Sequence, residues 1–149
     1  AITLEWRDRS GSDERLKVLV GSIPPGAGDN DLSLVVDWRS PGCIVLFTGD
    51  VERPREALLP AARADVLKVP HHGSDSSSSP RLLQAVSPRH AIISVQGGRY
   101  GLPSPGVIER LRAHGAAVHR TDHHGQIDVT CRGGELRLRR RLPVRPRAP

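Results

Sequence analysis

Two short apolar runs, joined by a segment that can form one short helix, constrain the fold of this chain most strongly. The first run, residues 43–48, is rich in β-branched residues and leads into Gly49 and Asp50. The second run, residues 64–69, follows a possible helix within residues 52–62. A continuous apolar run like the first is typical of a strand buried on both faces, as in parallel sheets with covering helices, and the second run indicates a further buried strand. The unit therefore predicts an α/β fold.

Residues with ligand chemistry follow both runs. Asp50 stands after the first run, and His71 and His72 stand just after the second. If the two strands are parallel neighbours, all three side chains leave the same edge of the sheet. A carboxylate beside imidazoles suits zinc or manganese, so the first hypothesis is a metal-binding edge. The plainer alternatives are that Asp50 caps the next helix and that the histidines are ordinary polar surface residues.

Four further residues near these runs are candidates for phosphate binding. Asn30 and Ser33 precede a predicted strand, Lys68 lies within the second run, and Ser74 begins a serine-rich loop that ends at Ser79. Their amide, ammonium and hydroxyl groups can donate hydrogen bonds to a phosphate. Each also has a plainer structural interpretation. Asn30 and Ser33 could form a turn that leads into the strand, Lys68 could place its ammonium group at the sheet edge, and Ser74 could belong to a flexible loop.

The rest of the chain alternates between strand and helix patterns. Ser-Pro pairs at Ser79 and Ser104 predict helix starts, with serine as the cap and proline in the first helical position. The expected strands are 2–6, 16–20, 33–38, 43–48, 66–69, 91–95, 118–121, 126–131 and 135–141, and the expected helices are 52–62, 80–86 and 104–114. This alternation predicts a mixed β-sheet covered by helices. Because only 3% of residues are aromatic, the core must consist of Leu, Val, Ile and Ala.

Three features have plain structural interpretations. Cys43 and Cys131 fit no metal-ligand spacing and are expected to be small core residues, with a disulfide between them possible. A second histidine pair, His123 and His124, precedes Gly125 and is expected to lie in an exposed turn. The chain contains no segment of transmembrane length and no signal-peptide pattern, so this stretch is expected to be soluble.

The charge is unevenly spread along the chain. The formal net charge is +6, and arginines cluster near the C-terminus. This charge favours polyanionic partners, and an arginine-rich composition also fits a GC-rich coding sequence. Residues 1–136 are assigned to one partial domain and residues 137–149 to a basic tail rich in arginine and proline. The tail is expected to be solvated, and any attraction to DNA there would be independent of sequence and sensitive to salt.

Six segments occur in an order that resembles a known family. They are residues 30–35, 46–50, 65–74, 87–95, 99–101 and 120–122. Together they resemble the metallo-β-lactamase-like domain of ComEC-type DNA-uptake channels, and the likeness covers roughly residues 15–130. The resemblance implies an αββα sandwich of the metallo-β-lactamase type, of which this chain would be the C-terminal half.

The resemblance also implies a function. The domain would be a metal-dependent nuclease of a competence protein, using two zinc or manganese ions to degrade the DNA strand that is not imported. Asp50 would bridge the ions, and one of His71 and His72 would complete an ion's shell while the other faces a phosphate. The implied partners are DNA, the membrane-embedded channel part of the parent protein and other competence proteins. The implied location is a soluble domain of a bacterial inner-membrane protein, on its extracytoplasmic face.

Two departures from the family pattern leave alternatives open. The family's His-x-His-x-Asp-His motif does not occur in the chain, and there is no methionine, so the chain is interpreted as a fragment that supplies half of the ligands. Leu102 also stands where the family pattern Tyr-Gly-His-Pro has histidine. The alternatives are a catalytically inactive DNA-binding module of the uptake channel, or another metal-dependent hydrolase, of small phosphoesters, lactones or thioesters.

Overall fold

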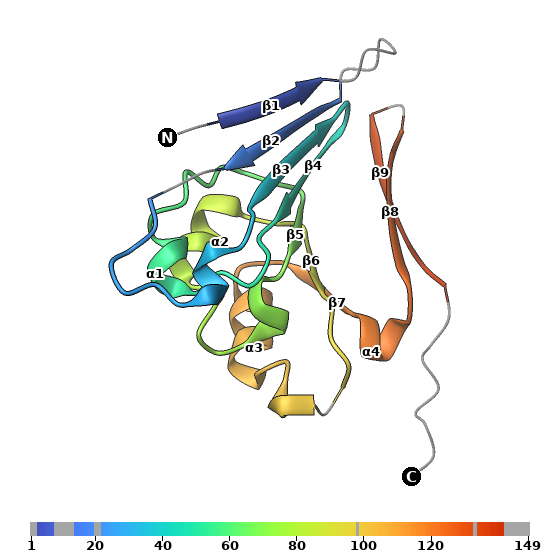
Figure 1. The fold of residues 1–149 in the computed structure, drawn as a ribbon. Coiled ribbons are helices and arrows are strands. Elements are labelled where there is room, and N and C mark those ends of the chain that lie inside the picture. The colour runs from blue at the N-terminus through green and yellow to red at the C-terminus, as the bar shows by residue number, and fades with distance from the viewer. Residues whose placement is uncertain (1–2, 8–13, 20–21, 98, 133, 142–149) are drawn as a thin grey trace.

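The computed structural model describes residues 3–7, 14–19, 22–97, 99–132 and 134–141. It contains a seven-stranded sheet, covering helices and a separate two-stranded hairpin (Figure 1). The strands are β1 (Thr3–Arg7), β2 (Arg15–Leu19), β3 (Val36–Ser40), β4 (Cys43–Phe47), β5 (Val66–Lys68), β6 (His90–Ile93), β7 (Ala117–Arg120), β8 (Ile127–Arg132) and β9 (Glu135–Arg140). The helices are α1 (Arg53–Glu56), α2 (Pro80–Val86), α3 (Pro105–Ala113) and α4 (Thr121–His124), and the 3₁₀ turns are η1 (Asp29–Leu32), η2 (Pro70–Gly73) and η3 (Arg99–Gly101). The predicted mixed sheet with helices is confirmed.

The sheet changes from antiparallel to parallel at β4. Strands β1 to β4 form an antiparallel meander, and strands β4 to β7 run parallel in sequence order. Parallel neighbours require crossover connections, which contain α1, α2 and α3 in turn. The strands that precede Asp50 and the first histidine pair are parallel neighbours, as predicted, with Val45 opposite Val66.

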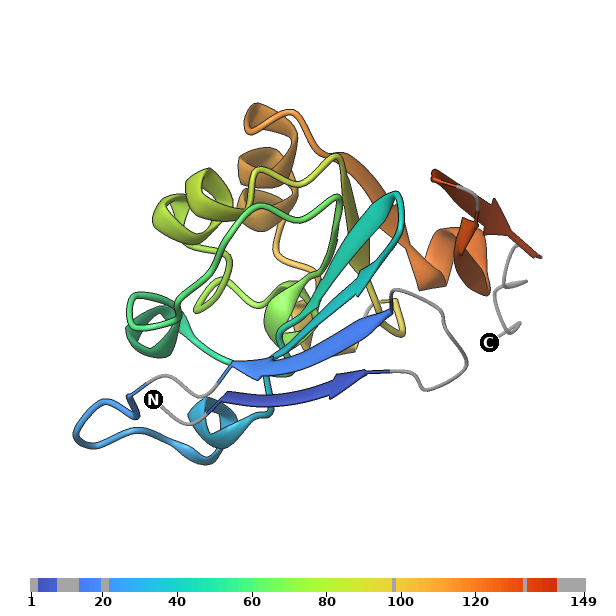
Figure 2. The ribbon, with the colours of Figure 1, turned by 90° about the horizontal axis from the view of Figure 1, so that it is seen from above.

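Helices α1 to α3 and the β8–β9 hairpin lie on opposite faces of the sheet, and α4 leads from β7 into the hairpin (Figures 1 and 2). Successive strand residues point to opposite faces. Leu46 and Leu67 therefore belong to the main core beneath the helices, whereas Val45 and Val66 form a smaller cluster with Val129 of the hairpin. The main core consists of buried Leu, Val, Ile and Ala, as the low aromatic content predicted.

A disulfide between Cys43 and Cys131 joins β4 to β8. The two Cα atoms are 5.9 Å apart, within the usual range for a disulfide, and Cys43 is buried. Both residues belong to the smaller cluster between the sheet and the hairpin. The hairpin is thus attached to the sheet both covalently and by apolar packing.

Helix α1 is much shorter than predicted, ending at Glu56 instead of residue 62. Pro60 has no N–H with which to continue the helix. The Glu56 carboxylate also accepts hydrogen bonds from the backbone N–H groups of Ser78 (2.5 Å) and Ser79 (2.8 Å) in a distant loop. The helix end is therefore fixed by tertiary contacts that a local sequence pattern does not contain.

Other boundaries follow the predictions more closely. Helix α2 matches its predicted range, and the Ser79 hydroxyl caps it by accepting a hydrogen bond from the Leu82 N–H (3.2 Å). Ser104 precedes α3 but makes no side-chain cap bond, so its predicted capping role is wrong. Strand β3 starts at Val36 rather than Ser33, because η1 occupies the preceding turn.

The C-terminal part forms the hairpin. Residues 137–140, the start of the predicted tail, belong to β9 and pair with β8, while residues 142–149 lie outside the described residues. The second histidine pair lies in α4, a single helical turn followed by Gly125, whose φ is positive (68°). The predicted turn is confirmed, but only His123 is exposed, and His124 is half-buried. Within the described ranges, no helix combines the length and apolar character needed to cross a membrane.

Candidate functional site

The loops after β4 and β5 meet at the carboxyl edge of the sheet. The Thr48 hydroxyl donates a hydrogen bond to the Lys68 carbonyl (2.6 Å), which joins the two strand ends. The His71 N–H donates to the Gly49 carbonyl (3.2 Å), which joins the two loops. These bonds bring Asp50 and the first histidine pair together, as the sequence predicted for parallel neighbours.

Both histidines of this pair have left-handed backbone conformations. The φ angles are 45° at His71 and 53° at His72, followed by 80° at Gly73. For residues with a Cβ this conformation costs about 1–2 kcal/mol each. The turn is held by hydrogen bonds from the Ser74 N–H to the His71 carbonyl (2.8 Å) and from the Ser104 N–H to the Gly73 carbonyl (2.9 Å). Such strain often occurs where a side chain must take a functional direction.

His72 faces Asp50. Its Nε2 lies 3.7 Å from Oδ1 of Asp50, and both side chains are about half exposed, at 46% and 41%. The other ring nitrogen, Nδ1, lies 2.6 Å from the Ser94 carbonyl oxygen. Because a carbonyl oxygen can only accept, Nδ1 must carry the hydrogen. In the neutral ring, Nε2 then has the free lone pair directed toward the Asp50 side.

His71 faces a different carboxylate, that of Glu52. Its Nδ1 lies 3.2 Å from Glu52 Oε1 and 3.4 Å from the Ser76 hydroxyl. Glu52 Oε1 also accepts from the Ser76 hydroxyl (3.0 Å) and from the Asn30 amide (3.4 Å). The sequence interpretation did not include Glu52 in the site. The sequence offered one indication of this role, namely that Glu52 is a carboxylate only two residues after Asp50.

The arrangement fits part of a metal site. Two ligands of a tetrahedral zinc ion lie about 3.3 Å apart, and the distance between Asp50 Oδ1 and His72 Nε2 is close to that at 3.7 Å. Histidine ligands usually donate their second ring N–H to a carbonyl or carboxylate, and both His71 and His72 have such an acceptor at Nδ1. Within the described ranges, no group of three or more His, Cys, Asp or Glu residues could hold a metal ion.

The predicted phosphate-binding residues lie around this centre, and their predicted role stays a prediction. The Ser33 hydroxyl accepts a hydrogen bond from the Asp50 N–H (3.0 Å), and the Asn30 amide donates to Glu52. Burial lowers the pKa of Lys68, and the negative charge of Asp50 opposes this shift. The Lys68 ammonium donates to the Val69 carbonyl (2.9 Å).

The serine-rich loop after the histidine pair packs closely against its surroundings. Ser77 and Ser78 are fully buried, and the Ser77 hydroxyl lies within hydrogen-bonding distance of the Pro70 (3.0 Å) and Ser74 (2.9 Å) carbonyl oxygens. The Ser74 hydroxyl lies 3.0 Å from that of Ser76, which in turn contacts Glu52. The hydrogen bonds of this loop thus help to hold the histidine pair in place.

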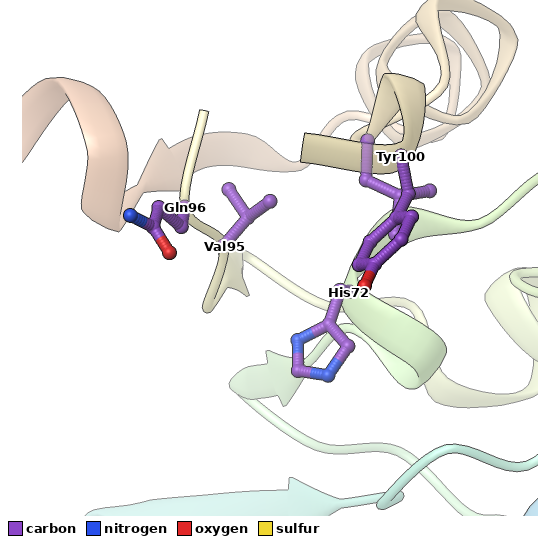
Figure 3. Close-up of a pocket in the computed structure, with 5 residues that line it drawn as sticks. His72, Val95, Gln96 and Tyr100 are labelled. Carbon is purple, nitrogen blue, oxygen red and sulfur yellow. The ribbon is translucent and has the colours of Figure 1, made fainter. Parts of the chain in front are cut away.

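A cavity of about 220 Å³ opens beside His72 (Figure 3). Val95, Gln96, Tyr100 and Leu102 complete its lining. The Tyr100 ring extends toward His72, with Val95 and Gln96 across the cavity. Tyr100 is 82% exposed and has a left-handed backbone (φ 57°). Leu102 gives the cavity an apolar side chain where the family resemblance leads us to expect histidine.

Several known proteins are similar to this chain in sequence. The chain is 38% identical over 120 residues to ComE operon protein 3 of Bacillus subtilis, which is 77% of this chain and 16% of that protein. It is 35% identical over 118 residues to competence protein ComA of Neisseria gonorrhoeae, which is 75% of this chain and 17% of that protein. It is 40% identical over 106 residues to recombination protein 2 of Haemophilus influenzae, which is 68% of this chain and 13% of that protein.

The chain is similar to one segment of competence-related proteins. It spans about a sixth of the length of these relatives. No family model matches the chain. The predicted kinship with competence proteins is confirmed at this level, while the metallo-β-lactamase-like domain stays a prediction.

Proposed function

We propose that this chain is part of a metal-dependent nuclease domain that hydrolyses DNA phosphodiester bonds during DNA uptake. The observation that carries the proposal is the pairing of Asp50 with His72 at the carboxyl edge of parallel strands, 3.7 Å apart. The hydrogen bond from His72 Nδ1 to the Ser94 carbonyl supports it, because it leaves Nε2 available as a ligand. The similarity to competence-related proteins supports a role in DNA uptake.

Each residue has a role in this proposal. Asp50 and His72 would hold zinc or manganese, and further ligands would come from outside the described residues. When bound, divalent ions of this kind lower the pKa of a bound water and polarise a phosphodiester. His71, oriented by Glu52, would stabilise negative charge or protonate the leaving sugar oxygen. Lys68 would contact a phosphate oxygen of the substrate near Asp50.

The proposed architecture is half of an αββα sandwich. Helices cover one face of the sheet, and the other face carries an apolar cavity of about 320 Å³ beside the hairpin. Its lining includes Trp38, Phe47 and Ile92, and Phe47 is 44% exposed. In a sandwich, a second sheet would pack over this face.

The proposed location is the extracytoplasmic side of the bacterial inner membrane, in a protein with a membrane-embedded channel part and other competence proteins as partners. The Cys43–Cys131 disulfide supports this location, because disulfides persist in oxidising compartments and are rare in the cytosol.

A nuclease assay with an Asp50 variant tests the enzyme proposal. The protein is incubated with end-labelled DNA and manganese or zinc. Asp50→Ala should abolish cleavage, since a carboxylate ligand is lost. Asp75→Ala is the matched control, because Asp75 is an exposed carboxylate whose nearest ion pairs are with Arg53 and Arg110. Full cleavage by Asp50→Ala would refute the assignment.

A DNA-binding module without turnover is the second candidate function. Leu102 favours it, because a leucine beside His72 can neither bind a metal nor transfer a proton. The same assay separates the two candidates: DNA bound in the presence of either metal but never cleaved supports the module. Cleavage that depends on Asp50 supports the nuclease.

A further inference from the structure

The outward face of the β8–β9 hairpin is strongly basic. Residues that alternate along a strand share one face. The outward residues include four exposed arginines and two carboxylates: Arg132, Arg137, Arg139, Arg141, Asp128 and Glu135. The inward residues Val129, Cys131 and Leu136 pack against the sheet. We call the outward set the arginine face.

The arginine face is hollowed. A cavity of about 390 Å³ is lined by its four arginines together with Asp128 and the Thr130 hydroxyl. Arg137 and Arg139 stand at alternate positions of β9, so their Cα atoms are separated by about 6.8 Å. Guanidinium groups so spaced on a concave surface present forked donors to successive phosphate oxygens of a polyanion.

The carboxylates neutralise only part of this charge. Glu135 pairs with Arg137 (2.8 Å), and Asp128 pairs with Arg141 (2.5 Å). Arg132 and Arg139 have no carboxylate or hydrogen-bond partner among the described residues. Two guanidinium groups therefore remain available to an anionic ligand.

The hairpin is held firmly enough to act as a platform. The Cys43–Cys131 disulfide joins it to β4. On its inner side, Arg140 Nη2 donates a hydrogen bond to His119 Nδ1 (3.1 Å) on β7. A surface held at both ends loses little conformational freedom when a ligand binds.

We propose that the arginine face binds the phosphate backbone of single-stranded DNA, at a surface separate from the Asp50–His72 edge. The choice of DNA as the polyanion rests on the proposed function, whereas the surface itself follows from the hairpin geometry. The contact would be independent of base sequence, because it reaches phosphates and no base edge. It would hold the DNA strand on the domain whether or not cleavage occurs.

Salt-dependent binding of a paired arginine variant tests this proposal. Binding of the 149-residue chain to a fluorescein-labelled single strand is followed by anisotropy, with EDTA present so that no metal-dependent cleavage contributes. Arg132→Ala combined with Arg139→Ala should weaken binding. The slope of log K against log salt concentration should become shallower by about 1.4, since each lost phosphate contact on a single strand removes about 0.7.

The matched control is Arg81→Ala combined with Arg112→Ala. These exposed arginines lie on α2 and α3, on the opposite side of the sheet, and their removal changes the net charge equally. The control should keep the wild-type slope. Equal slopes for both pairs, or no DNA binding by the wild-type chain, would overturn the proposal. So would binding to phosphatidylserine vesicles that needs Arg132 and Arg139 while DNA binding does not.

The result is independent of the nuclease assay. Loss of cleavage in Asp50→Ala with unchanged DNA binding in EDTA would support both proposals. Wild-type binding that depends on Arg132 and Arg139, with no cleavage under any metal, would support the arginine face and refute the nuclease.

Discussion

Loss of the Cys43–Cys131 disulfide should lower the free energy of unfolding by about 4.6 kcal/mol, because the unfolded chain then regains the entropy of a long open loop. The two cysteines are 88 residues apart in the sequence, which sets the length of this loop. Domains are typically stable by about 5–15 kcal/mol, so the loss is between a third and nearly all of the total. A large effect is therefore expected from two small side chains, of which Cys43 is buried and Cys131 partly buried.

The measurement is urea denaturation of the oxidised wild-type chain and of the double variant Cys43→Ala and Cys131→Ala. The variant is preferable to simple reduction, because it removes the bond whether or not a reductant reaches Cys43, which is 2% exposed, or the partly buried Cys131. The variant should unfold at a much lower urea concentration. Dithiothreitol should then destabilise the wild type after full unfolding and refolding, while leaving the variant unchanged. Equal midpoints for oxidised wild type and variant would refute the reasoning.

Three further perturbations have definite expected outcomes. His119 is 5% exposed, and burial, aided by the charge of Arg140, lowers its pKa to about 4. The unfolded chain thus binds more protons between pH 6.5 and about 4, so stability should fall by about 2–3 kcal/mol as the pH drops through this window, and His119→Gln should flatten that slope in urea titrations. Ser79→Ala should cost about 1 kcal/mol and Ser104→Ala almost nothing, because only the first hydroxyl caps its helix; thermal melts of both check this. Gly49→Ala should cost at least about 1–2 kcal/mol in the same melts, because φ is +56° and the new Cβ would lie 2.6 Å from the Ser33 Cβ.

The meeting of Asp50 with the first histidine pair was predictable from sequence. Each follows an apolar run with a helix-forming segment between, and a crossover of that kind places the two strands parallel. Which histidine faces Asp50 was not predictable. Adjacent residues normally point to opposite sides, and here two successive left-handed residues set the directions of His71 and His72.

The role of Glu52 was also beyond the sequence. Its carboxylate contacts His71 and Ser76, which lie in the connection between β5 and α2, and Asn30, which lies in η1 before β3. Neither the spacing of apolar residues nor a helix-capping pattern in a single sequence predicts contacts between segments so far apart in the chain. The strands that build the sheet, in contrast, were found within a few residues, because their apolar runs are local properties of the chain.

The order of the sheet has a consequence for how the chain folds. Strands β1 to β7 lie in the sheet in the order in which they occur in the sequence, so each strand pairs with its immediate neighbours along the chain. Contacts between nearby segments form quickly, because little loop entropy is lost before they are made. The docking of β8 beside β4 is different, since it joins residues 88 positions apart. We therefore expect the seven strands to assemble first and the hairpin to close over them as a distinct, slower phase in refolding kinetics.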